Sequence, residues 1–115
     1  MRADLARNAG RYRDAATLYR EVLKLAPGEA AMHIQAGHML KEAGALADAE
    51  AHYRRAEALT PHDPDLALQI GHLHKVAGRP AEAEQAYRRA LQLDPGSGEA
   101  RRELAVLDGS PQLPR

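Results

Sequence analysis

The sequence contains no cysteine, phenylalanine or tryptophan, and apart from histidine its only aromatic residues are four tyrosines. Without cysteine the chain can form neither a disulfide nor a thiolate zinc site, and it has no cysteine nucleophile. β-Strands draw on β-branched and aromatic residues, so a β-sandwich or β-barrel is not expected. Alanine and leucine are abundant instead. The composition therefore predicts an all-α protein whose helices pack closely through small side chains.

An excess of charge of one sign is also missing. Sixteen basic residues balance 16 acidic residues, which argues against nucleic acid or an anionic membrane as the partner. The apolar runs are too short to span a bilayer. No hydrophobic segment follows Met1, so a secretory signal is not expected and the cytoplasm is the predicted location.

What the chain does contain is an internal repeat of 34 residues. Seven columns of identical residues recur at this spacing: Ala9/Ala43/Ala77, Gly10/Gly44/Gly78, Ala15/Ala49/Ala83, Tyr19/Tyr53/Tyr87, Arg20/Arg54/Arg88, Leu25/Leu59/Leu93 and Pro27/Pro61/Pro95. Alanine could coincide by chance in such a composition, but tyrosine, glycine and proline could not. One hairpin cannot bury all these apolar faces, so the repeats must stack on their neighbours.

Each repeat is predicted to hold two helices. Glycine favours the C-terminus of the first helix at Gly44 and Gly78, and proline ends the second helix before Pro61 and Pro95. Asp63 and Ser97 are predicted N-caps. The expected helices cover residues 2–9, 12–25, 30–43, 46–59, 64–77, 80–93 and 98–108. Residues 109–115 are expected to form a disordered tail.

Two further columns predict how the helices pack. One column is always small (Ala3, Gly37, Gly71 and Ala105), as a close crossing of the two helices in a repeat requires. The tyrosine column supplies one bulky ring per repeat, and we expect each ring to wedge between successive repeats.

This helix-turn-helix unit resembles the tetratricopeptide repeat. The residues that carry the resemblance are Gly37, Gly44, Ala49, Tyr53, Ala56 and Pro61 in one repeat, and Gly71, Gly78, Ala83, Tyr87, Ala90 and Pro95 in the next. The family's aromatic residue near the start of the first helix is absent, since His33 and Ala67 stand there. The resemblance implies an all-α solenoid with a right-handed superhelical twist. It would be a single array over residues 1–108, comprising a truncated repeat at about 1–29, repeats at 30–63 and 64–97, and a terminal helix at 98–108.

In such arrays the first helices line a concave surface that binds ligands. Helical spacing places the following residues on that face: Arg7, Ile34, Gln35, His38, Lys41, Leu68, Gln69, His72 and Lys75. Arg7, Lys41 and Lys75 form a basic row that could meet acidic groups of an extended or helical peptide. The alternative is that this face is merely solvated, and that the identical residues reflect duplication. Some relatives clamp a peptide's carboxylate at slots that here hold Ile34, His38, Gln69 and Asp65, so that mode is not expected.

No catalytic or metal centre is predicted. The chain shows no Ser-His-Asp set, paired-carboxylate site or phosphate-binding loop. His33, His52 and His62 are interpreted as scattered surface or boundary residues. The predicted function is therefore that of a non-catalytic interaction scaffold, with a protein or peptide as partner and no cofactor.

Two alternatives stay open. The stretch Gln-x-Gly-His-x-x-Lys-x-Ala-Gly, at residues 35–44 and 69–78, is similar to repeats beside bacterial glycosyltransferase domains, so the chain could be a region or relative of such an enzyme. Alternatively the array could self-assemble by end stacking, through Leu5 at one end and Leu104 and Leu107 at the other.

Overall fold

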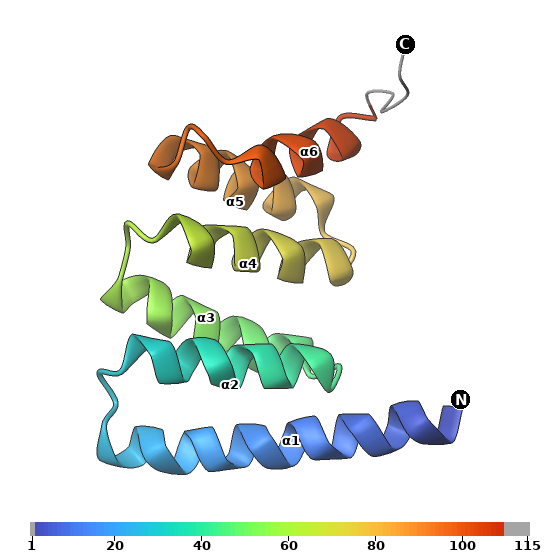
Figure 1. Ribbon diagram of the computed structural model, residues 1–115, viewed down its shortest axis with the longest axis vertical. Helices are drawn as coiled ribbons and strands as arrows, with labels where there is room; N and C mark the ends of the chain where they lie inside the picture. The colour runs from blue at the N-terminus through green and yellow to red at the C-terminus, as the bar shows by residue number, and fades with distance from the viewer. Residues whose placement is uncertain (1, 110–115) are drawn as a thin grey trace. The chain divides into compact units, whose positions relative to one another are not determined.

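The computed structural model describes the backbone of residues 2–109 and the side chains of residues 9–109. Within that range the secondary structure consists of helices joined by turns (Figure 1). The chain divides into two compact units, residues Met1–Pro61 and His62–Arg115. The first unit contains α1 (Arg2–Leu25), α2 (Ala30–Glu42) and α3 (Leu46–Leu59), and the second contains α4 (Pro64–Val76), α5 (Pro80–Leu93) and α6 (Gly98–Leu107).

Helices α2 to α6 agree with the sequence prediction to within one residue at either end. Gly44 and Gly78 adopt positive φ angles of 84° and 75°, which a residue with a Cβ rarely tolerates. After Gly44 the Ala45 amide donates to the Leu40 carbonyl at 2.8 Å, and the Gly44 amide donates to the Lys41 carbonyl at 3.0 Å. The same pair of bonds recurs at Gly78. These bonds satisfy the last carbonyls of α2 and α4 and turn the chain into the next helix.

The predicted N-caps are confirmed at two helices. The Asp63 carboxylate accepts from the Asp65 and Leu66 amides at 3.0 and 3.3 Å, and Pro64 occupies the first turn of α4. The Ser97 hydroxyl accepts from the Ala100 amide at 3.2 Å at the start of α6. Each cap satisfies amides that lack a partner inside the helix, which is worth about 1 kcal/mol.

The prediction of two helices before residue 26 is wrong. Residues 2–25 form one continuous helix, α1, and Gly10 lacks the positive φ of Gly44 and Gly78. Residues 2–9 make only about two helical turns and offer little apolar area to hold a folded-back hairpin. Continuing the helix keeps its backbone hydrogen bonds, at a cost of about 1 kcal/mol for a glycine inside a helix.

The tyrosine rings lie against glycines inside their own hairpins. Tyr53 of α3 is fully buried, and a Cβ placed on Gly37 of α2 would approach its ring to 2.5 Å. Tyr87 of α5 stands in the same relation to Gly71 of α4, again at 2.5 Å. The small column therefore receives the ring and brings the two helices of one hairpin together, and Tyr87 also packs in one cluster with Ala100 of the following helix, as the expected wedge requires.

In the second unit the core also reaches α6. Tyr87 belongs to a buried cluster with Ala67 and Leu68 of α4, Ala83 and Ala90 of α5, and Ala100 of α6. Leu104 and Leu107 are partly buried against this cluster rather than forming an open apolar end. The outer faces of the second helices carry ion pairs, as between Arg88 and Glu84 at 2.7 Å and Arg54 and Glu50 at 3.8 Å. Among the described residues, no helix combines the length and apolar character that a membrane crossing requires.

We predict that Gly37→Ala destabilises the protein by about 1–3 kcal/mol, because the new methyl group would overlap the buried Tyr53 ring. Gly28→Ala is the control, since a Cβ there meets nothing within 4 Å, and its effect should stay within about 0.5 kcal/mol. Urea unfolding followed by circular dichroism measures both. Equal midpoints for the two variants would contradict the assigned packing.

Candidate partner-binding face

The face predicted on α2 is assembled as one stripe of half-buried side chains. Ile34, Gln35, His38 and Lys41 follow one another along the helix at this face, and all four keep some access to solvent. No hydrogen bond or ion pair joins Lys41 to another residue that the structure describes. This stripe therefore offers an amide, an imidazole and an ammonium group to a ligand.

The corresponding residues of α4 contact helix α6. The His72 Nε2 donates to the Glu99 carboxylate at 2.8 Å, and the Lys75 ammonium donates to Glu103 at 2.9 Å. Glu99 and Glu103 are one helical turn apart on α6, while His72 and Lys75 are three residues apart on α4. The pair His-x-x-Lys thus binds two carboxylates that are presented by a helix.

In both hairpins the histidine of this face is bonded to the buried tyrosine. His38 Nδ1 lies 2.6 Å from the Tyr53 hydroxyl, and His72 Nδ1 lies 2.7 Å from the Tyr87 hydroxyl. The Glu99 carboxylate can only accept, so His72 carries its hydrogen on Nε2, and Nδ1 of the neutral ring accepts from Tyr87. Burial, and to a smaller extent Lys41, lower the pKa of His38, while Glu42 acts in the opposite direction.

These tyrosines serve the packing rather than any chemistry. Burial raises the pKa of the Tyr53 hydroxyl, and Glu42 adds to the rise. Burial likewise raises the pKa of Tyr87, with contributions from Glu103 and Glu99. A fully buried hydroxyl that stays protonated satisfies its hydrogen-bonding need through the histidine and has no access to a substrate.

Three predicted face residues need comment. Leu68 is only 7% exposed and packs in the core cluster of the second unit, so its placement on an open face is wrong. It is buried because α6 is in the same cluster, beside α4 and α5. The side chain of Arg7 lies outside the described residues, and Gln69 is half-buried on α4.

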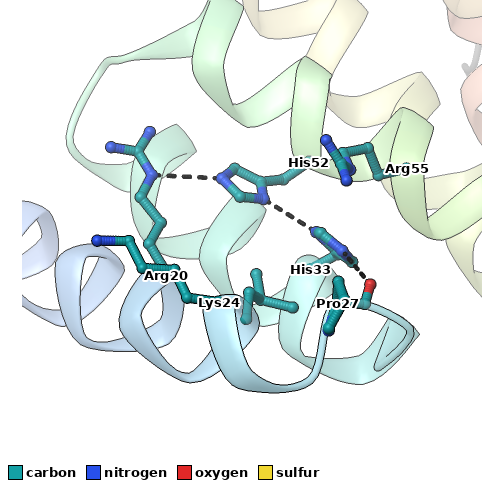
Figure 2. Close-up of a pocket in the computed structure, with 7 residues that line it drawn as sticks. Arg20, Lys24, Pro27, His33, His52 and Arg55 are labelled. Atoms are coloured by element: carbon teal, nitrogen blue, oxygen red, sulfur yellow. Dashed lines mark hydrogen bonds between the residues drawn. The ribbon is translucent and has the colours of Figure 1, made fainter.

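A pair of histidines in the first unit escaped the sequence prediction (Figure 2). His33 of α2 is 3% exposed, so its interpretation as a surface or boundary residue is wrong. Its Nδ1 lies 3.1 Å from Nδ1 of His52 on α3, and its Nε2 lies 3.1 Å from the Pro27 carbonyl. The Arg20 Nε of α1 donates to His52 Nε2 at 3.3 Å. One chain of hydrogen bonds therefore links α1, α2, α3 and the turn at Pro27.

The ends of this chain fix the tautomer of each ring. The Pro27 carbonyl only accepts, so His33 carries its hydrogen on Nε2 and accepts at Nδ1. Arg20 only donates, so His52 accepts at Nε2 and donates from Nδ1 to His33. A second proton on His33 would place its Nδ1–H against the Nδ1–H of His52. A second proton on His52 would place its Nε2–H against the Nε–H of Arg20. The network is complete only when both imidazoles are neutral.

Comparisons with known proteins show the family of this chain. Two sequence models described as tetratricopeptide repeat match the chain, one over residues 1–64 and the other over residues 64–107. The chain belongs to the tetratricopeptide repeat family. A search of curated proteins found no match to its sequence.

Solved structures agree on the fold, an all-α solenoid of helical repeats. The first tetratricopeptide repeat domain of Spaghetti (RPAP3), bound to an HSP90 peptide, is 21% identical with a TM-score of 0.79, covering 94% of this chain and 90% of that one. The Yersinia enterocolitica type III secretion chaperone SycD, in complex with a peptide of the translocator YopD, is 18% identical with a TM-score of 0.78 and coverages of 92% and 91%. The Arabidopsis OM64 domain is 19% identical with a TM-score of 0.78, covering 93% of each chain.

A signal for the histidine pair was present in the repeat itself. His33 stands near the start of the first helix, at the position where the tetratricopeptide repeat family carries an aromatic residue. One repeat later that position holds Ala67. His52 is likewise replaced by Ala86 one repeat later. Two residues that differ together between copies could have indicated a contact. Among residues 9–109, no three histidine, aspartate or glutamate side chains gather closely enough to hold a metal ion.

We predict that the histidine pair makes stability fall in mild acid. Burial first, then Arg20, His33 and Arg55, lower the pKa of His52, against a rise due to Asp48. An unfolded histidine takes up its proton near pH 6.5, before the folded ring does. Stability is therefore full above pH 6.5 and falls as the pH decreases below it, because the unfolded chain then binds more protons.

Urea unfolding at pH 7.5 and pH 5.5 measures this loss. In His33→Ala/His52→Ala, which copies the alanines of the following repeat, the loss between the two pH values should be smaller. His62→Ala removes an exposed histidine and should leave the loss as in the wild type. An unchanged loss in the double variant would exclude the pair as its source.

Proposed function

We propose that this protein is a non-catalytic interaction scaffold that binds an acidic peptide segment of a partner protein along the first helices of its repeats. In the tetratricopeptide repeat family these helices line the ligand-binding groove. The observation that carries the proposal is the contact of α6 with α4. There a His-x-x-Lys pair binds Glu99 and Glu103, so the chain itself contains a helix whose two glutamates are held by this pair.

The same pair occurs on α2 as His38 and Lys41, and Gln35 stands one turn before His38. Lys41 has no ion-pair partner among the described residues, whereas Lys75 is already neutralised by Glu103. A peptide carboxylate could pair with Lys41, and the Gln35 amide could bond a peptide backbone. Two structural neighbours, from Spaghetti (RPAP3) and Yersinia SycD, are each described with a bound peptide, which supports peptide binding as the mode of action.

We predict that Lys41→Glu weakens the binding of an acidic peptide about tenfold or more. A hydrogen bond to a charged group contributes about 1.5–3 kcal/mol, and the substitution also adds repulsion. The peptide is first selected on the wild type from a library of short random peptides, and its affinity is then measured by fluorescence anisotropy. Arg13→Glu on α1 makes the same charge change at an exposed site and serves as the control. Equal losses in both variants would overturn the assignment of this face.

A second candidate function, self-association, is favoured by an exposed apolar stripe on α1. Leu18, Val22 and Leu25 are 69%, 45% and 90% exposed and follow one another along one side of the helix. Val22 belongs to the column of Ala56 and Ala90, both of which are fully buried. The position of Val22, which the later repeats bury, is thus open on α1, and we propose that a second copy of the chain covers the stripe.

We predict that light scattering shows the wild-type mass rising with concentration toward that of a dimer, and that Val22→Glu abolishes the rise by placing a charge in the stripe. Thr17→Glu adds the same charge to an exposed residue of the same helix and should behave as the wild type. A wild-type mass that stays monomeric over the whole concentration range would remove this candidate.

A further inference from the structure

A cavity of about 180 Å³ lies beside the histidine pair in the first unit (Figure 2). Its walls come from three helices and one turn. Arg20, Leu23 and Lys24 belong to α1, His52 and Arg55 to α3, and Pro27 and His33 complete it. The hydrogen-bonded imidazoles form one side of the cavity, and three cationic side chains surround it.

The charges around this cavity are of one sign. No carboxylate is among the described residues that line it. Arg20 pairs with Asp48 at 3.6 Å and Lys24 with Glu21 at 3.1 Å, but these pairs are exposed and add little to stability. Arg55 has no hydrogen bond or ion pair with any residue that the structure describes. The site therefore holds more positive charge than its neighbours neutralise.

A second cavity, of about 220 Å³, continues the first. The two share Pro27, His33 and Arg55, and the second adds Ala58 and Leu59 of α3. One end of the combined crevice is thus basic, and the other end is lined by apolar side chains. This arrangement suits a ligand that carries a negative group beside a hydrocarbon group.

Some residues of the crevice change from one repeat to the next, whereas Arg20, Arg55 and Pro27 recur as Arg54, Arg89 and Pro61. One repeat later, Ala67 stands at the position of His33, Ala86 at that of His52, and Ala58 at that of Lys24. Alanine therefore suffices for the scaffold at these positions. The two histidines that touch are replaced together, which indicates a local role of the pair.

We propose that this crevice binds an anionic group, a carboxylate or a phosphate, attached to an apolar group, with Arg20, Lys24 and Arg55 as its cationic partners. Arg55 is the residue best placed to form a new charge-assisted hydrogen bond, since it has no hydrogen-bond or ion-pair partner among the described residues. The apolar end at Ala58 and Leu59 holds the rest of the ligand.

Binding of the anion is coupled to protonation of His52. Without a bound anion, an added proton on His52 faces Arg20, Arg55 and His33, and the carboxylate of Asp48 opposes their effect. An anion in the crevice supplies further negative charge and compensates the proton. By reciprocity, the ligand binds more tightly at pH 6 than at pH 8, and it raises the pH at which His52 takes up its proton.

The test uses N-acetyl-leucine, its uncharged amide and inorganic phosphate as probes on the full chain. Binding is followed through the ring signals of His33 and His52 in NMR spectra at pH 6 and pH 8. We expect N-acetyl-leucine to shift both rings, to bind more tightly at pH 6, and to lose affinity at least about fivefold in Arg55→Gln. Arg54→Gln, the same change on the neighbouring residue outside the crevice, should bind as the wild type.

Several outcomes separate the possibilities. Binding of phosphate without N-acetyl-leucine would support the anion site and assign phosphate as its group. Equal binding of the uncharged amide, equal losses in Arg54→Gln and Arg55→Gln, or unmoved histidine signals at saturation would overturn the proposal. The His33→Ala/His52→Ala variant lacks these ring signals, so its binding is measured by isothermal titration calorimetry; it should keep its helical spectrum and lose the pH dependence of binding. The proposal does not depend on the peptide face of α2.

Discussion

The contact of a tyrosine ring with a glycine is the constraint on which each complete hairpin depends. The ring of Tyr53 occupies the space that a side chain at Gly37 would fill, and Tyr87 does the same at Gly71. With no Cβ in the way, the two helices can approach closely enough for alanines to form the rest of their contact. This explains how a chain with almost no aromatic volume builds a buried core. The hydroxyl of each ring needs a partner once it is buried, and His38 and His72 supply it.

Much of the fold follows from the sequence because the residues that begin and end helices recur with the 34-residue period. Gly44, Gly78, Asp63 and Ser97 act locally, through backbone angles and caps, so their effects can be predicted without tertiary contacts. The continuity of α1 could not be predicted in this way. Gly10 has the same neighbours in sequence as Gly78, an alanine before it and an arginine after it, but a turn there needs a long enough preceding helix to pack against the next one. That balance is a tertiary property.

The candidate sites were predictable to different degrees for the same reason. The helical period placed Gln35, His38 and Lys41 on one face of α2, and in the structure all three belong to that helix and keep some access to solvent. It could not show that α6 would bring Glu99 and Glu103 to His72 and Lys75, nor that Leu68 would be buried in the cluster that α6 joins. The His33–His52 contact joins two helices, and no pattern within one helix reveals it.

Comparison between the copies then separates two kinds of residue. His38 and His72 are identical because each satisfies the buried tyrosine of its own hairpin, so their repetition is explained by the scaffold. His33 and His52 break the repeat, and the following copy packs with alanines at both positions. Two polar rings in a buried site cost free energy of folding unless every donor finds an acceptor. Here the series of hydrogen bonds from Arg20 through His52 and His33 to the Pro27 carbonyl meets that condition. Specific chemistry in such arrays is therefore better sought where the copies differ than where they agree.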